Sequence, residues 1–304
     1  MIHKILLFAF ACFSFGKVNA CDVCASGGAG NYVGIVPNFS KNMIGLRAQF
    51  QSATFQVHEL NTNGTSQIEA DQYFRSDLWL RYFLTKRLQA QVVLPFQVNR
   101  RSETERSTTI NGLGDLSTFC HYTLINRGDS INIRHKWTWT LGGGFQLPTG
   151  KYQQRDETKA MLPGLFQIGS GSYGLMVNQN LGYRFKAIGF ATQYQFTHLT
   201  ENEIGFKRGA VHNASLLCYY WYRKDIVSLL PSLGIVYSSF GYNQNYGVSD
   251  PFSGGENVST SIGLDLYYLS WVLQTNGYLS IYQDMKANMP QGNWQISIGI
   301  SRFF

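Results

Sequence analysis

The sequence is short of charged residues. Only 14% of its 304 residues are charged, whereas 44% are hydrophobic and 15% are aromatic. A soluble enzyme has about 25% charged residues, so the composition fits that class poorly. It fits a transmembrane β-barrel, in which apolar and polar residues alternate along each strand and cancel in the average hydropathy.

Long apolar runs are also missing. After residue 20, no unbroken apolar stretch approaches the roughly 20 residues that a transmembrane helix needs. This excludes a helical membrane protein. The formal net charge is +7, but the basic residues are scattered, so nucleic acid is not an expected partner.

The N-terminus has the features of a secretion signal. Lys4 precedes an apolar run over residues 5–15, and small residues at 18–20 offer a cleavage site before Cys21. Two kinds of processing are open here, plain cleavage or lipoprotein processing with acylation of Cys21. We expect residues 1–20 to be the signal peptide, the Gly- and Cys-rich residues 21–41 to lie in the periplasm or the lumen, and residues 42–304 to form the barrel.

The C-terminal segment alternates strictly between large apolar and small polar residues. This period of two predicts a strand with one apolar and one wet face. The chain closes on Phe304, and an amphipathic last strand that ends in an aromatic residue is typical of outer-membrane barrels, which present it to the barrel-assembly machinery. The apolar face consists of Trp294, Ile296, Ile298, Ile300, Arg302 and Phe304, and the other face of Gln295, Ser297, Gly299, Ser301 and Phe303.

The same alternation recurs along the chain, and the connections alternate in length. Short turns are expected near Lys86, Gly128, Lys186, Lys224 and Ser270, and long polar loops near Asn63, Glu103, Arg155, Glu203, Asn245 and Ala287. Short periplasmic turns and long extracellular loops are the rhythm of an outer-membrane barrel. Residues 165–185 are too long for one simple strand, and the glycines at 169 and 171 can bulge or split this segment. Counting it once predicts an all-β, up-and-down antiparallel barrel of about 12 strands.

Charged residues on the wet faces predict a water-filled lumen. Arg75, Asp77 and Arg81 alternate with leucines, and each charge would be costly to bury in lipid. Together with Arg47 and Asp115 they are the residues expected to line the lumen. They can form a charged constriction that selects solutes, or a salt-bridged filling of a narrow barrel that conducts nothing. The aromatic belts at the membrane interfaces are expected to include Trp137, Trp139, Trp294 and Phe304.

Three short glycine-rich motifs carry a resemblance to a known family. They are Gly-Leu-Gly-Asp-Leu at 112–116, Leu-Pro-Thr-Gly-Lys at 147–151 and Gln-Ile-Gly-Ser-Gly-Ser at 167–172. Together they resemble the outer-membrane putative transporter family of the meta-pathway-of-phenol-degradation type. The Cys-Asp-Val-Cys start with residues 34–39 and 41–47 is similar to a Bacteroidetes-like subgroup. The resemblance implies a barrel assigned to transport, and the motifs are expected to mark barrel corners.

Cys21 and Cys24 form a Cys-x-x-Cys pair. In the oxidising periplasm it can be a disulfide, and with further ligands a metal site. No histidine follows Cys24, which excludes a c-type haem, and no cofactor is expected. Cys120 and Cys218 are expected to be isolated strand cysteines that fill apolar positions.

Asp115, Ser117 and His121 share one face of a strand, which suggests a hydrolase. Ser117 and His121 would be roughly 13 Å apart at about 3.3 Å per residue, too far for a hydrogen bond.

The sequence as a whole favours a passive channel for a small, hydrophobic or aromatic, solute in the outer membrane. The alternatives are a non-conducting structural or interaction barrel that binds a partner or metal through its loops or the cysteine pair, and an outer-membrane hydrolase.

Overall fold

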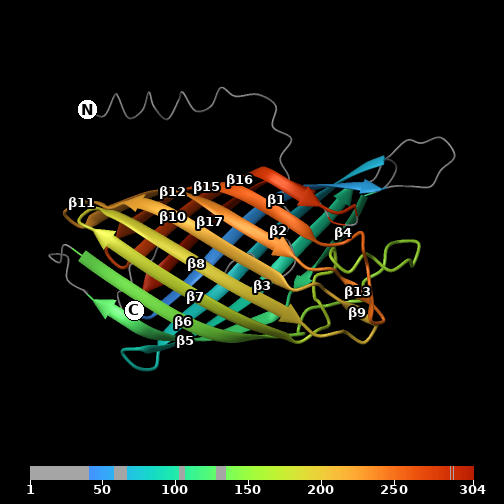
Figure 1. Cartoon of the computed structure of the whole chain (residues 1–304), viewed down its shortest axis with the longest axis horizontal. Coiled ribbons are helices and arrows are strands. Elements are labelled where there is room, and N and C mark those ends of the chain that lie inside the picture. The colour runs from blue at the N-terminus through green and yellow to red at the C-terminus, as the bar shows by residue number, and fades with distance from the viewer. Residues whose placement is uncertain (1–40, 58–66, 103–106, 128–134, 288, 290) are drawn as a thin grey trace, which may run out of the picture.

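A computed structural model of the chain (Figure 1) describes residues 41–57, 67–102, 107–127, 135–287, 289 and 291–304. The expected signal peptide, the N-terminal segment 21–40 and the Cys21–Cys24 pair lie outside the described residues. Within the described ranges, no helix is long and apolar enough to cross a membrane.

Twelve long strands close into an antiparallel barrel, in which β17 pairs with β1 to complete the ring. This confirms the all-β barrel that the sequence predicts. In chain order the wall strands are β1 (Met43–Val57), β2 (Gln67–Phe83), β3 (Leu88–Ser102), β5 (Leu116–Arg127), β6 (His135–Leu147), β7 (Gly174–Phe185), β8 (Ile188–Leu199), β10 (Val211–Tyr220), β12 (Val227–Phe240), β15 (Gly255–Tyr268), β16 (Trp271–Met285) and β17 (Gln291–Phe303).

Five shorter strands extend the wall or join its loops. β4 (Ser107–Leu113) continues the hairpin of β3, and β11 (Tyr222–Lys224) pairs with β12 near the opposite end. A small three-stranded sheet is formed by β9 (Phe206–Lys207), β13 (Gln244–Asn245) and β14 (Val248–Ser249). This small sheet lies at the right-hand end in Figure 1, where the long loops gather. The short-turn end is the one that faces the periplasm in outer-membrane barrels.

The outer surface is apolar and the inner surface is polar. Ile296, Ile298 and Ile300 of β17 are close to half exposed, whereas Ser297 and Ser301 between them are buried. Trp137, Trp294 and Phe304 are exposed on the outer face, and Trp139 shares that face but is partly buried. An outer surface this apolar needs lipid around it, because a monomer in water seldom exposes a continuous apolar belt. The barrel therefore spans a membrane.

The segment 165–185 is split. β7 begins only at Gly174, and residues 165–173 leave the wall. Gly171 has a φ of +65°, a conformation that favours glycine, and it lies just before β7 begins. The segment is therefore split near its glycines, as the sequence suggests, and it contributes one strand to the wall.

Candidate functional site

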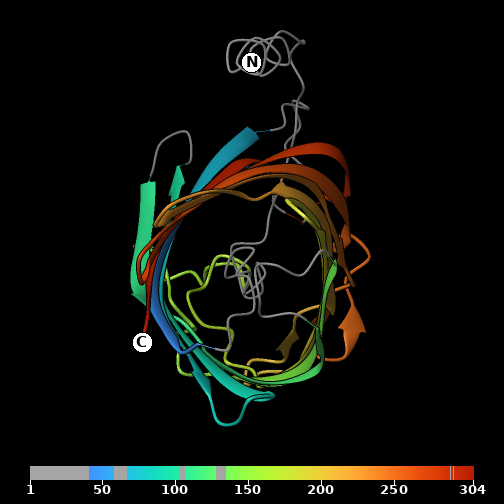
Figure 2. The ribbon, with the colours of Figure 1, turned by 90° about the vertical axis from the view of Figure 1, so that its left-hand side faces the viewer.

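The connection between β6 and β7, residues 148–173, lies inside the barrel. Figure 2 shows this yellow-green chain inside the ring of strands. Its apolar side chains reach opposite walls, because Phe166 packs on β1, β2 and β4, whereas the adjacent Leu165 packs on β10 and β12. We call residues 148–173 the inner strap. The contacts on the first wall are made by Leu162, Phe166 and Ile168 with Ala53, Tyr73 and Ile110, and on the second by Leu165 with Val211 and Phe240.

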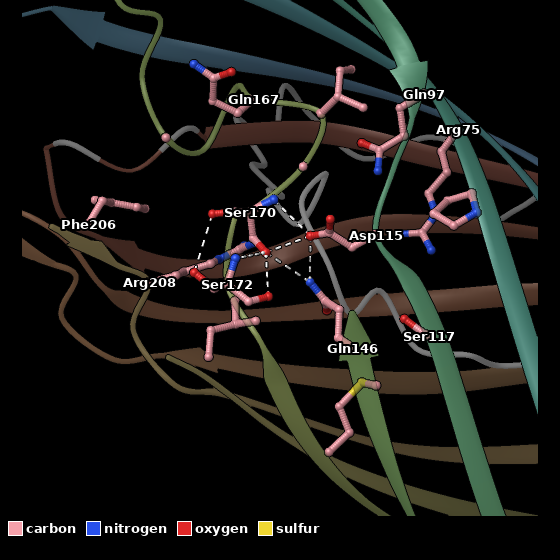
Figure 3. A pocket seen from close by; sticks show the side chains of 16 residues that line it. Arg75, Gln97, Asp115, Ser117, Gln146, Gln167, Ser170, Ser172, Phe206 and Arg208 are labelled. Atoms are coloured by element: carbon pink, nitrogen blue, oxygen red, sulfur yellow. Dashed lines mark hydrogen bonds between the residues drawn. The ribbon is translucent and has the colours of Figure 1, made fainter. Parts of the chain in front are cut away.

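The carboxylate of Asp115 holds both ends of the inner strap. Its Oδ1 accepts a hydrogen bond from the backbone N–H of Gly150 at 2.9 Å. Its Oδ2 accepts from the backbone N–H of Ser170 at 2.8 Å, from the Ser170 hydroxyl at 2.6 Å and from Nε2 of Gln146 at 2.9 Å. Figure 3 shows this arrangement from close by. A carboxylate with these donors closes the strap into a loop that starts and ends at the same point of the wall.

The three glycine-rich motifs meet at this point. A Cβ on Gly169 would lie 2.4 Å from the carbonyl carbon of Gly150, so the two backbones are in direct contact. The N–H of Gly169 donates to the carbonyl oxygen of Lys151 at 2.8 Å. The motifs at 112–116, 147–151 and 167–172 therefore do more than turn corners of the barrel. They form one docking point for the inner strap.

We expect Gly169→Ala to displace the strap, because a methyl group cannot fit between the two backbones. The cost of overpacking is about 1–3 kcal/mol, and the variant should show new trypsin cleavage at Lys151 or Arg155 within the strap. Gly143→Ala is the matched control, since its Cβ would meet the Met176 carbonyl oxygen at an ordinary 3.8 Å. Equal trypsin resistance of both variants would contradict the close approach.

A further contact ties the strap to the loop beyond β8. The Tyr152 hydroxyl donates to Oε2 of Glu203 at 2.6 Å. This hydrogen bond raises the pKa of Tyr152 above its ordinary value, so the hydroxyl remains a donor at neutral pH.

The wall beside the strap carries paired charges. Asp77 is fully buried between two arginines, with Arg75 Nε at 2.6 Å from Oδ1 and Arg47 Nε at 3.0 Å from Oδ2. These three sequence-predicted residues come together on β1 and β2. One buried carboxylate here contacts two guanidiniums.

A second pair lies nearer the long-loop end. Arg101 donates from Nε and Nη2 to the two oxygens of Asp71, each at 2.8 Å, and its guanidinium lies 4.8 Å from the centroid of the Phe166 ring. Sequence reasoning misses this pair because residues 100–112 are charged and resemble a loop. The signal was present in the parity of β3, where Arg101 follows the inward-facing Gln97 and Asn99.

A pocket that opens to solvent lies between the inner strap and the wall (Figure 3). Its lining combines polar side chains, among them two arginines and one aspartate, with apolar ones such as Ile168 and Phe206. The polar lining residues are Arg75, Gln97, Asp115, Ser117, Gln146, Gln167, Ser170, Ser172 and Arg208.

Arg81 is separate from the other predicted lumen residues. It faces the lumen on β2 toward the short-turn end, and it is buried. The structure thus places the five predicted residues at two levels, with Arg47, Arg75, Asp77 and Asp115 beside the strap and Arg81 beneath them. Their role in selecting solutes stays a prediction.

The proposed hydrolase residues have other partners. Asp115 binds the strap, and Nε2 of His121 lies 2.8 Å from Nδ2 of Asn178. Within the described part of the chain, no hydrogen bond joins Ser117 to His121. The described ranges also hold no group of three or more metal-ligating side chains, and Cys120 and Cys218 are free and exposed on the outer face.

No family model and no curated protein matches the chain. The fold is similar to the crystal structure of an outer membrane channel from Pseudomonas putida F1, with a TM-score of 0.66 and 16% identity over 87% of this chain and 96% of that one. The beta domain of a Bordetella autotransporter matches with a TM-score of 0.48 and 11% identity over 86% of this chain and 99% of that one. The translocator domain of an autotransporter from Neisseria meningitidis matches with a TM-score of 0.43 and 12% identity over 87% of this chain and 88% of that one.

At these identities the similarity is one of fold. A closed antiparallel barrel with an apolar exterior and short turns at one end is the architecture of outer-membrane proteins. The chain is therefore an outer-membrane β-barrel, while the family resemblance of its motifs stays a prediction.

Proposed function

We propose that this barrel is a passive outer-membrane channel for a small solute. The observation that carries the proposal is the pocket between the inner strap and the arginine-bearing wall, inside a barrel whose inner face is polar and whose exterior is apolar. Arg47, Arg75, Asp77 and Asp115 would set the charge of the narrowest passage beside the strap, and transport would follow the concentration gradient without a cofactor. The mature protein would begin after residue 20 and reach the membrane through recognition of β17 by the barrel-assembly machinery.

The solute is small on this proposal. A barrel of twelve strands has a narrower interior than the open porins with about 16–18 strands, and here the strap takes part of that space. The resemblance to the family named after phenol degradation adds the expectation of a solute with an aromatic or hydrophobic body.

Planar-bilayer recordings of the purified protein test the proposal. We expect discrete conductance steps, and we expect Arg75→Ala to lower the ratio of anion to cation permeability, because it removes one of two positive charges that share Asp77. Arg302→Ala is the control, since Arg302 lies on the outer face over the Trp271 ring at 5.5 Å. If both variants conduct with the same ion selectivity, Arg75 does not contribute to the selectivity of the channel.

A non-conducting barrel is the second candidate, and the strap favours it specifically. Contacts of the strap with both walls can fill the lumen, and the loops would then serve a binding partner. Absence of conductance and of solute entry into liposomes for the wild-type protein, with conductance appearing in a strap-released variant, would favour this candidate over the channel.

A further inference from the structure

Toward the short-turn end, two arginines from different walls face the lumen, and no carboxylate of the described residues forms an ion pair with either. Arg81 projects from β2 and Arg184 from β7. Both side chains are closely packed, and each residue is only 8% exposed. Beside the strap, by contrast, Arg47, Arg75 and Arg101 are each paired with an aspartate. Buried arginines beside the strap therefore have carboxylate partners, whereas none of the described carboxylates pairs with the two arginines toward the short-turn end.

The contacts of Arg81 are weak for a buried guanidinium. Its Nη2 lies 2.8 Å from the sulfur of Met43 and 3.5 Å from the carbonyl oxygen of Lys41. The ring of Phe83 lies 5.6 Å from the guanidinium carbon. The Nε atom is buried and has no hydrogen-bond partner among the described residues. Arg81 thus keeps a donor that points at no acceptor of the described chain.

Arg184 has the same kind of surroundings. Its Nη1 donates to the carbonyl oxygen of Lys186 at 2.5 Å, and its guanidinium lies 5.0 Å from the centroid of the Trp221 ring. Its Nε is also buried without a partner in the described part of the chain. A second cationic donor is therefore available at this level.

Two tyrosines lie in the apolar cluster between these arginines. Tyr267 on β15 belongs to the same buried cluster as Met43, whose sulfur is the contact of Arg81 Nη2. Tyr219 on β10 packs against this cluster together with Trp221, the ring that the Arg184 guanidinium contacts. We call Arg81, Tyr267, Tyr219 and Arg184 the arginine–tyrosine ring.

Apolar side chains pack around the ring. Trp79, Leu217, Tyr267 and Phe303 belong to one buried cluster, against which Tyr219 and Trp221 pack. Asp265, two residues before Tyr267, is a buried carboxylate, and no ion pair joins it to Arg81 or Arg184 in the described ranges. The site therefore combines cationic donors with aromatic walls.

A buried charge without a counter-charge is expensive, and the cost falls when an anion binds beside it. The planar guanidinium fork matches the two oxygens of a carboxylate, and aromatic side chains accept an apolar ring. We propose that the arginine–tyrosine ring is a binding site for a small organic anion with an aromatic body, an aromatic carboxylate in chemical class. This inference rests on the proposed channel and names the solute class for its lumen.

Binding of benzoate to the full-length protein in detergent micelles tests the site. It is followed by intrinsic tryptophan fluorescence, to which Trp79 and Trp221 at the site contribute two of six tryptophans. We expect a saturable change with benzoate and at least roughly tenfold weaker binding of benzyl alcohol and benzylamine, which keep the ring but lack the carboxylate. Arg81→Gln and Arg184→Gln should each weaken benzoate binding by roughly tenfold. Arg302→Gln on the outer face should leave it unchanged.

Arg81→Lys keeps the charge but loses the fork, so it should bind benzoate with intermediate affinity and controls for misfolding of the glutamine variants. Three results would each contradict the proposed site. They are equal affinity for benzoate and benzyl alcohol, displacement of bound benzoate by chloride as readily as by unlabelled benzoate, and unchanged benzoate affinity in both glutamine variants. Conductance of the same samples keeps the two proposals apart. A barrel that conducts but does not bind benzoate would contradict only the proposed binding site. A barrel that binds benzoate but does not conduct would contradict only the proposed channel.

Discussion

Asp115→Ala is expected to release the inner strap and to raise the conductance of the barrel. Hydrogen bonds to a charged acceptor contribute about 1.5–3 kcal/mol each, and this carboxylate accepts from Gly150, from Gln146 and twice from Ser170. Their loss should weaken docking of the strap by several kcal/mol. The wall itself should survive, because Asp115 lies at the break between β4 and β5 and outside the paired strands.

Two measurements report the released strap. Single-channel recordings should show larger steps than the wild-type protein, and trypsin should cut at the strap residues Lys151, Arg155 or Lys159. Asp225→Asn, in an exposed turn between β11 and β12, is the control and should change neither. Wild-type conductance together with wild-type trypsin resistance in Asp115→Ala would mean that the apolar contacts of the strap suffice to hold it.

Asp77→Asn is expected to destabilise the barrel and to strengthen its preference for anions. The substitution leaves Arg47 and Arg75 facing each other without the carboxylate that both contact. Breaking a buried charge pair from one side costs about 3–5 kcal/mol, since the remaining charge is left uncompensated. Urea unfolding in lipid vesicles measures this loss, and reversal potentials under a salt gradient measure the change in selectivity.

Asp284→Asn is the matched control for this prediction. Asp284 is an exposed residue of β16 whose contact with Lys286 is 3.8 Å long, so its removal should cost little. Comparable stability of the Asp77 and Asp284 variants would show that water in the lumen already screens the two arginines.

The apolar and wet faces of the strands follow from the sequence alone. In β17 the isoleucines at 296, 298 and 300 face out and the serines at 297 and 301 face in, as the alternation predicts. A strand places successive side chains on opposite faces, so parity is a local property. The same argument places Arg75, Asp77 and Arg81 of β2 on the inner face without reference to their partners.

The inner strap was beyond sequence reasoning. Residues 148–163 have the polar composition of an extracellular loop, and nothing local tells such a loop to fold into the lumen. What brings it there is a set of non-local contacts, above all Asp115 with Gly150 and Ser170 and the approach of Gly169 to Gly150. Similarly, parity shows that Arg81 and Asp77 face inward but not which arginine receives the carboxylate.

The sequence by itself determined that the chain is an all-β outer-membrane barrel, because the alternation of apolar and polar residues and the spacing of turns are local properties of the sequence. The tertiary structure decided that β17 closes on β1, that the strap lies inside the lumen, and that, among the described residues, Asp77 pairs with Arg47 and Arg75 whereas no carboxylate pairs with Arg81 or Arg184. The physical reason is that hydrogen bonds and ion pairs across the lumen depend on the register and closure of distant strands, which no local pattern encodes.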